Sequence, residues 1–230
     1  SSIQNDLKGS EYWHYYGSQI DYKNRYAVVN GDIGMQDLNS ENSYVQQVVA
    51  NYIKSLKNDG VDGIRWDAAK HIALPSEDCN FWPAVTSEGL FNYGEILVGP
   101  TDDEQNSNNT PLMQEYTNYM TVTDSIYGKT LREAFKNGNI TSSIGNWSER
   151  GVSKSKLIYW AESHDTYSNN GEYGEDSRTS NQNQIDRAYA ILAAQANAMT
   201  LYFSRPSQTI KNNIKIGVRG STAFKSDEIA

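Results

Sequence analysis

The sequence predicts an α/β fold organised around a parallel β-sheet, and three observations favour this class. Short apolar segments alternate with longer amphipathic segments of helical periodicity from residue 41 onward. Two of the helical segments run up to a glycine, Gly60 or Gly138, a residue that commonly ends a helix. Acidic side chains follow the apolar segments, and parallel sheets place their functional groups at the carboxyl ends of their strands.

The first predicted elements appear after a long irregular lead-in. Residues 1–40 show no regular pattern, since Gly, Asn and Asp are scattered among tyrosines. The first helix is predicted at 41–59 because its apolar residues recur at helical spacing: Tyr44, Val45, Val48, Val49, Tyr52, Ile53 and Leu56. The segment 61–67, VDGIRWD, is short and favours extended structure, which predicts the first strand.

The same alternation continues to residue 206. Four more strands and two more helices are expected, the strands at 90–99, 119–123, 155–165 and 200–206 and the helices at 125–138 and 184–199. Because strands and helices alternate, the strands are expected to be parallel. The polar run TDDEQNSNNTP at 101–111 predicts an exposed loop after a strand.

The composition weighs against several classes of protein. The formal net charge of −8 repels phosphate backbones, so we expect no nucleic-acid partner. No apolar run approaches the ~18 residues that span a bilayer, so we expect neither membrane insertion nor a signal peptide in this chain. Cys79 is the one cysteine, so an internal disulfide is impossible. The 16 tyrosines and 5 tryptophans suit a surface that stacks flat ligands.

Charged residues at the first two strand ends have the pattern of a paired-carboxylate site. Arg65 and Asp67 are two residues apart in a strand and therefore share a face, and an adjacent arginine favours an ionised, nucleophilic carboxylate. Glu95 lies between Gly94 and Ile96, an apolar setting that would raise its pKa and suit a general acid. One ionised and one protonated carboxyl group is the pairing that glycoside hydrolysis needs.

A structural role is the alternative for each of these groups taken alone. Arg65 and Asp67 could form an ordinary ion pair, and Glu95 could be a satisfied carboxylate at a sheet end. The dipeptide His164-Asp165, at the end of the strand predicted at 155–165, carries little weight by itself. The joint placement of acids at three strand ends favours the catalytic interpretation.

The segments around these acids resemble the conserved stretches of the α-amylase family of glycoside hydrolases. GIRWDAAKH is similar to the second stretch, YGEIL to the third and ESHDTY to the fourth, while MQDLN at 35–39 resembles the segment before the fourth strand. TLYFSRP and VRGSTAFKS are similar to the eighth-strand region of bacterial members. The matches occur in the family's order, which makes them more specific together than any one is alone.

The resemblance implies a role for each acid. Asp67 would be the nucleophile of a covalent glycosyl intermediate, and Glu95 the acid that protonates the leaving oxygen and then activates water. Asp165 would bind the hydroxyls of the distorted sugar ring. A retaining mechanism of this kind places the two principal carboxyl groups roughly 5–5.5 Å apart.

The resemblance also implies substrate and metal contacts. Arg65 would orient Asp67, His164 would hydrogen-bond the same sugar, and Lys70 and His71 would line the leaving-group side of the cleft. A structural calcium is expected between the barrel and a protruding loop domain, with the carboxylate of Asp37 and the backbone carbonyl of His71 among its oxygen ligands. The alternative for Asp37 is a turn or cap aspartate before the helix that follows.

The chain departs from the family in one respect, because the first conserved stretch, a third-strand segment that ends in Asn-His, has no match. The five predicted strands would be strands four to eight of a (β/α)8 TIM barrel, which needs eight strands and about 250 residues. We therefore expect residues 1–50 to be a remnant of the calcium-binding loop domain and 51–230 the C-terminal part of the barrel. A partial barrel has open strand edges, so this segment alone is expected to be poorly soluble or inactive.

The leading functional hypothesis is retaining endo-hydrolysis of α-1,4-glucosidic bonds in starch-like α-glucans. An α-glucan transglycosylase or an exo-glucosidase of the same family would use the same three carboxyl groups. A non-catalytic carbohydrate-binding relative and an unrelated solute-binding or structural α/β module rank lower, because the principal acids are present in order. The expected partner is an α-glucan polysaccharide or oligosaccharide. The family implies a monomer, and the polymeric substrate implies an extracellular location.

Overall fold

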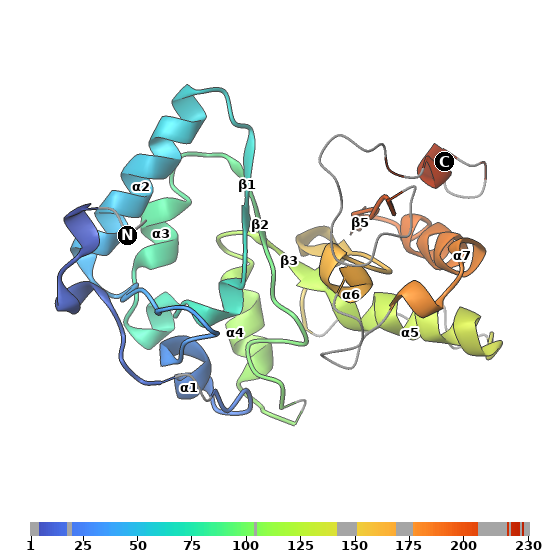
Figure 1. Ribbon diagram of the computed structural model, residues 1–230, viewed down its shortest axis with the longest axis horizontal. Helices are drawn as coiled ribbons and strands as arrows, with labels where there is room; N and C mark the ends of the chain where they lie inside the picture. The colour runs from blue at the N-terminus through green and yellow to red at the C-terminus, as the bar shows by residue number, and fades with distance from the viewer. Residues whose placement is uncertain are drawn as a thin grey trace. The chain divides into compact units, whose positions relative to one another are not determined.

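The computed structural model describes residues 5–17, 20–103, 105–141, 151–168, 177–206, 220, 222–225 and 227. The chain divides into two compact units (Figure 1). Unit 1 comprises Ser1–Thr123 with Arg150–Val152, and unit 2 comprises Asp124–Glu149 with Ser153–Ala230. Each unit has its own strands, helices and buried core.

Unit 1 is built on three parallel strands, β1 (Gly63–Trp66), β2 (Phe91–Gly94) and β3 (Thr121–Asp124), the last of which ends at the boundary with unit 2. Arg65 pairs with Tyr93 across β1 and β2, and Tyr93 pairs with Thr121 across β2 and β3. The parallel pairing confirms the α/β organisation expected from the alternation of strands and helices. It also brings the carboxyl ends of β1 and β2 to the same edge.

The described part of unit 1 contains the α-helices α1 (Arg25–Asn30), α2 (Ser43–Asn58), α3 (Phe81–Val85) and α4 (Asn109–Tyr116). Helix α2 begins after Asn42, whose side chain accepts hydrogen bonds from the backbone N–H groups of Tyr44 and Val45, as a good N-cap does. The chain leaves α2 through Gly60, which adopts a left-handed φ of 94°. Short 3-10 turns occur at Asn5–Leu7, Ser10–Tyr12, Ala69–His71 and Pro75–Glu77.

An aromatic cluster packs α3 and α4 against the sheet of unit 1. Figure 1 shows α2 and α3 on one side of β1 and β2. Trp66 projects from β1 toward this side, and its ring lies edge-to-face against Trp82 of α3, with 5.4 Å between centroids. Trp82 also contacts Phe81 and, in α4, Tyr116. Because Trp66 faces these helices, Arg65 and Asp67 point to the other side of the strand.

Unit 2 contains α5 (Ser125–Asn137), β4 (Leu157–Tyr159), α6 (His164–Ser168), α7 (Gln182–Ala193) and β5 (Met199–Thr200). Its 3-10 turns are Lys154–Lys156, Ser177–Thr179 and Ala223–Lys225. Strands β4 and β5 are parallel, with Ile158 opposite Met199. Helices α5 and α7 pack along each other (Figure 1), and between them and β4 lie the fully buried side chains of Leu131, Leu157, Tyr159, Ile185, Tyr189 and Leu192.

The structure corrects several boundaries. The predicted irregular lead-in contains α1, and the predicted loop at 101–111 runs into α4, which begins at Asn109, with Thr101 buried at its start. The strand predicted at 155–165 ends at Tyr159, so His164 and Asp165 lie on α6. The last strand is two residues long and begins at Met199, where the prediction began at 200. Four residues of VRGSTAFKS, at positions 218, 219, 221 and 226, lie outside the described residues.

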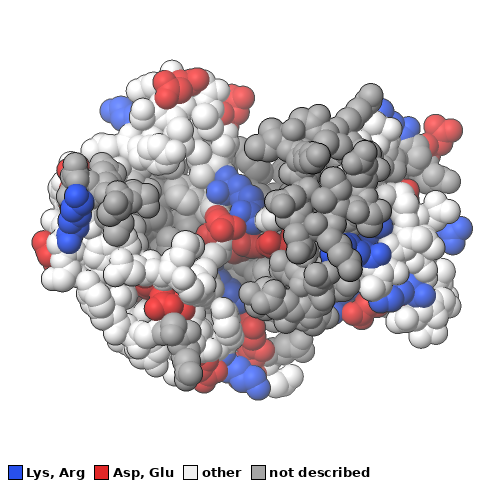
Figure 2. All heavy atoms as spheres, viewed as in Figure 1, with Lys and Arg blue, Asp and Glu red and all other residues white. Residues whose placement is uncertain are grey.

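No helix in the described part of the chain is long and apolar enough to cross a bilayer. On the face in Figure 2, the lysines and arginines are interspersed with acidic side chains. The exclusion of a nucleic-acid partner stays a prediction that rests on the net charge of −8.

Candidate active site

The carboxyl ends of β1 and β2 bring Arg65, Asp67 and Glu95 together. One nitrogen of the Arg65 guanidinium, Nη1, donates to Oδ1 of Asp67 at 2.6 Å. Its other terminal nitrogen, Nη2, lies 3.4 Å from Oε1 of Glu95. A single arginine therefore contacts both of the predicted principal acids. The Asp67 side chain is 77% exposed, whereas that of Glu95 is 14% exposed.

The backbone explains how two neighbouring strands present their acids differently. The β1–β2 pairing continues past the strand ends, because the Glu95 N–H donates to the Trp66 carbonyl and the Ala69 N–H donates to the Glu95 carbonyl. Between these bonds the chain turns at Ala68, which adopts a left-handed φ of 49°. The turn leaves Asp67 projecting into solvent, while the Ala68 N–H donates to Oε2 of Glu95 at 3.1 Å.

This left-handed alanine stores backbone strain. An L-residue in this conformation costs about 1–2 kcal/mol, and such strain is tolerated where the surrounding structure fixes it. At Ala68 the fixing contacts are the strand-like hydrogen bonds on either side and the bond to Glu95. Strain of this kind often marks a functional position, and here it lies directly beside the predicted nucleophile.

Tyr93 is a further member of the group that was not among the predicted site residues. Burial raises the pKa of this phenol, and the neighbouring Thr123 and Arg65 side chains oppose that shift. Burial disfavours the charge of Arg65, but the hydrogen bond to Asp67 and the charge of Glu95 outweigh it and raise the pKa of the guanidinium. The only sequence signal for Tyr93 was its position two residues before Glu95 in a strand.

Lys70 and His71 follow Asp67 but are engaged inside unit 1. The Lys70 side chain is buried, and its ammonium donates to the Leu97 carbonyl at 3.1 Å and to Asp102 at 2.9 Å. The His71 Nδ1–H donates to the Val28 carbonyl at 2.7 Å, and burial lowers the pKa of this imidazole. Their expected contact with substrate stays a prediction.

His164 and Asp165 form the first turn of α6 in unit 2. Both are well exposed, and Nε2 of His164 lies 3.4 Å from Oδ2 of Asp165. Asp67 and Glu95 belong to the other unit. The convergence of the three carboxylates, and the carboxyl spacing expected for a retaining enzyme, stay predictions.

Asp37, the predicted calcium ligand, is bound to a histidine. Nδ1 of His14 lies 2.6 Å from Oδ2 of Asp37, and Nε2 lies 2.9 Å from Oε2 of Glu41. The hydrogen bonds with Asp37 and Glu41 raise the pKa of His14 to about 9 even though burial lowers it. His14 is therefore an imidazolium at neutral pH, and a calcium ion would compete with it for Asp37.

The described residues offer an incomplete calcium shell. Calcium takes 6–8 oxygen ligands, and within the described ranges no cluster of three or more His, Cys, Asp or Glu side chains could hold a metal. The carboxylate of Asp37 and the carbonyl of His71 would be two ligands of such a shell, so the calcium site stays a prediction.

The comparisons with known proteins agree with the sequence resemblance. No family model matches the chain. An α-amylase of Clostridium acetobutylicum is 30% identical over all of this chain, which covers 29% of that protein. A cyclomaltodextrin glucanotransferase of Thermoanaerobacterium thermosulfurigenes is 29% identical over 60% of the chain, or 18% of its own length.

This chain is α-amylase-like. A crystal structure of a mutant of α-amylase I from Eisenia fetida, in complex with maltohexaose, superposes with a TM-score of 0.67 at 21% identity. The match covers 94% of this chain and 46% of that one, and at this identity it shows the fold. The α-amylase-like chain is thus a partial (β/α)8 barrel, as the sequence predicted. The chain spans less than a third of the length of each of the two curated relatives named above.

Proposed function

We propose that the protein to which this chain belongs hydrolyses α-1,4-glucosidic bonds in starch-like α-glucans, in endo mode and with retention of configuration. The observation that supports this most is the contact of one guanidinium, that of Arg65, with both Asp67 and Glu95. Two carboxyl groups on adjacent parallel strands, one open to solvent and one sheltered, suit the nucleophile and the acid/base of a retaining glycosidase.

In the proposed first step, Asp67 attacks the anomeric carbon and forms a glycosyl ester, while Glu95 gives its proton to the departing glycosidic oxygen. In the second step, Glu95 takes a proton from water, and the resulting hydroxide attacks the anomeric carbon and releases Asp67 as a carboxylate. The exposure of Asp67 gives the sugar access to the nucleophile.

Arg65 would serve both steps. Its charge favours ionised Asp67, and its hydrogen bond with the carboxylate fixes the direction of attack. The Ala68 N–H and Arg65 together would hold Glu95 in a single orientation for proton transfer. In this proposal Asp165 binds hydroxyls of the distorted sugar and His164 hydrogen-bonds the same ring.

Replacement of Asp67 by Asn in the full-length protein tests the nucleophile. The variant is expected to lose kcat on soluble starch by about four orders of magnitude, because the ester cannot form. A matched control is Asp62→Asn, since Asp62 is an exposed acid just before β1 and has no role in the proposal. Mass spectrometry with a slow 2-deoxy-2-fluoroglycosyl substrate should detect a glycosyl adduct on the peptide with Asp67. Unchanged turnover in D67N, or an adduct elsewhere, would refute the assignment.

Transglycosylation is a second candidate because the chain is similar to a cyclomaltodextrin glucanotransferase over 60% of its residues. The two reactions share the glycosyl ester and differ in whether water or a sugar hydroxyl accepts the glycosyl group. Analysis of the products from starch distinguishes them. Mixed linear oligosaccharides support endo-hydrolysis, cyclic products support the transferase, and release of glucose or maltose alone supports an exo-acting enzyme.

We further propose a calcium site, a monomeric state and an extracellular location. Asp37 and the carbonyl of His71 would contribute to the calcium shell. Calcium bound to Asp37 would weaken the attraction of that carboxylate for the His14 proton, so added calcium should lower the pKa of His14. A polymeric substrate cannot enter a cell intact, and this argument alone supports secretion.

A further inference from the structure

We propose that a buried ion pair in unit 2, Glu162–Arg205, is a positioning device for helix α6 and hence for His164 and Asp165. The inference rests on the proposed function for its catalytic consequence, but its structural content can be measured separately. Neither Glu162 nor Arg205 belongs to the proposed catalytic machinery.

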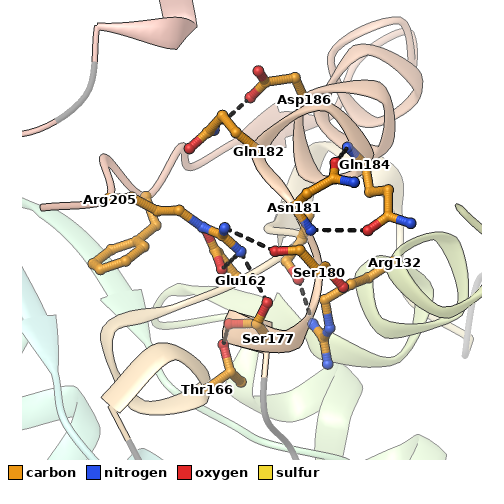
Figure 3. A network of polar contacts seen from close by, with 12 residues as sticks. Arg132, Glu162, Thr166, Ser177, Ser180, Asn181, Gln182, Gln184, Asp186 and Arg205 are labelled. Atoms are coloured by element: carbon orange, nitrogen blue, oxygen red, sulfur yellow. Dashed lines mark hydrogen bonds and ion pairs between the residues drawn. The ribbon is translucent and has the colours of Figure 1, made fainter. Parts of the chain in front are cut away.

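The pair has bidentate geometry (Figure 3) and almost no contact with solvent. Nε of Arg205 donates to Oε1 of Glu162 at 2.6 Å, and Nη2 donates to Oε2 at 2.9 Å. The Glu162 side chain is 0% exposed and that of Arg205 is 11% exposed. Parallel bonds of this kind fix direction as well as distance, because a planar fork meets a planar carboxylate.

Arg205 ties this carboxylate to two other segments. Nη1 donates to the Ser180 carbonyl and Nη2 to the Ser177 carbonyl, both at 2.9 Å. Its guanidinium also lies over the ring of Tyr167, a residue of α6, at 5.4 Å from the centroid. One side chain from the segment after β5 therefore contacts Glu162, two residues before α6, as well as the helix itself and the turn before α7.

The backbone that leads into α6 is held by two more side chains. The Tyr189 hydroxyl of α7 donates to the Glu162 carbonyl at 2.9 Å, and the Glu162 N–H donates back to that hydroxyl at 3.4 Å. Arg132 of α5, which is buried, donates through Nη1 to the Ala161 carbonyl. We call Glu162, Arg205, Tyr189 and Arg132 the α6 clamp.

Helix α6 needs external support because it is five residues long. An isolated helix of that length is unstable in water, since nucleation costs more than one turn of hydrogen bonds returns. His164 and Asp165 are both well exposed, so their own packing contributes little to the position of the helix. The clamp fixes the chain at Glu162, two residues before His164, through hydrogen bonds. The contact of Arg205 with the Tyr167 ring fixes the other end of the helix.

Stability alone is a weak reason for this arrangement. Burying two charges carries a large desolvation cost, and apolar replacements of buried ion pairs are often neutral or stabilising. Such a replacement would fill the volume but would not fix the direction of the chain at Glu162. The bidentate bonds and the two carbonyl contacts supply that direction, which a binding or catalytic side chain on α6 requires.

The test compares three variants of the full-length protein with the wild type. Glu162→Leu with Arg205→Leu removes both charges together, and Arg205→Lys keeps the charge but loses the fork. The matched control is Asn181→Ala, which removes the N-cap of α7 within the same polar network and leaves the ion pair intact (Figure 3). Each protein is measured by urea unfolding, by amide hydrogen exchange of residues 164–168, and by kcat and KM on starch.

We expect faster hydrogen exchange across α6 in the double leucine variant and in R205K, by about tenfold or more, and little change there in N181A. We expect kcat to fall about 100-fold in the double variant, the effect of roughly 1 Å of misplacement, with a smaller change in KM. If amide hydrogen exchange across α6 proceeds at the wild-type rate in both the double leucine variant and R205K, the inference is wrong, whatever the stability of these variants. If the double variant does not fold, R205K decides by the same exchange measurement.

These outcomes separate the inference from the proposed function. If the wild-type protein does not hydrolyse or transfer α-glucans, the proposed function fails while hydrogen exchange still reports on the clamp. If exchange rises in both clamp variants but kcat does not change, α6 is positioned by the clamp without a catalytic need for it. In that case the catalytic half of the inference is wrong.

Discussion

The sharpest pH prediction concerns His14, which lies between the carboxylates of Asp37 and Glu41. Removing its charge with His14→Gln should destabilise unit 1 at neutral pH. The reason is that the folded-state pKa of about 9 lies well above the ordinary value of 6.5, chiefly through the hydrogen bond with Asp37. The folded protein therefore retains a proton that the unfolded chain releases.

The sign and size follow from linkage. A raised histidine pKa contributes stability that is fully present below the unfolded pKa of 6.5 and is lost as the pH rises through about 9. Each pKa unit corresponds to about 1.4 kcal/mol, which gives about 3 kcal/mol as an upper value. Asp37 and Glu41 are partly exposed, so solvent screening reduces the expected contribution to about 1–2 kcal/mol.

The assay is urea unfolding of wild type and H14Q at about pH 6 and about pH 9.5. The free-energy difference between the two proteins should be about 1–2 kcal/mol larger at the lower pH. His71→Gln is the control, because burial lowers the pKa of His71, so the contribution of His71 to stability should be smaller at the lower pH, the opposite sign to that of His14. An NMR titration of the imidazole protons assigns each pKa directly. A His14 midpoint near 6.5, or an H14Q effect that is independent of pH, would refute the reasoning.

Two further predictions concern packing. Gly128→Ala should lower the free energy of unfolding by about 1–3 kcal/mol, because a Cβ there would lie 1.8 Å from the Trp160 carbonyl oxygen. The control Glu133→Ala, on the exposed face of α5, should change the free energy of unfolding by less than about 0.5 kcal/mol. Equal effects of the two substitutions in urea unfolding would contradict the close contact. Arg25→Met should lower the free energy of unfolding by about 3–5 kcal/mol, because Arg25 donates to both Glu77 oxygens and to the Lys70 carbonyl. Adding Glu77→Leu should restore part of that stability, because it removes the carboxylate left without its partner. A double variant no more stable than the single one would show that this carboxylate is not the cause of the loss.

The long elements were predictable because several local signals agree in each of them. Helix α2 has apolar residues at helical spacing, an Asn N-cap and a glycine after its end. Helix α5 begins after Asp124, whose carboxylate accepts from two N–H groups of the first turn, and ends at Gly138, which has a φ of 72°. Strands β1 and β2 carry apolar and aromatic residues, and these segments pair in parallel as expected.

The short helices were missed because tertiary contacts stabilise them. Helix α1 is six residues long, and its three buried residues, Ala27, Val28 and Val29, give too brief a pattern to recognise. Helix α3 is five residues long and is held by the contacts of Phe81 and Trp82 with Trp66. In both helices the apolar pattern is too short to distinguish a helix from a loop in the sequence.

The strand-end acids were predictable for a related reason. Arg65 and Asp67 share a face through a spacing of two, and the pairing of adjacent strands brings Glu95 to the same guanidinium. The His14 group and the α6 clamp were not predictable, because they join residues 23 to 43 positions apart in the sequence. No local spacing connects such residues, and only the fold brings them together.

Glu162 shows why position at a strand end is not enough to assign an acid to catalysis. It follows β4 more closely than Asp165 does, so a rule based on strand ends alone would select it. The structure argues against that choice, because the Glu162 carboxylate is sealed from solvent and both of its oxygens are bound to Arg205. A carboxyl group that attacks or binds a sugar must be reached by that sugar, and Asp67 and Asp165 meet this condition. Exposure of the carboxylate to solvent, together with its position after a strand, distinguishes Glu162, which holds α6 in place, from the acids proposed to contact the glucan.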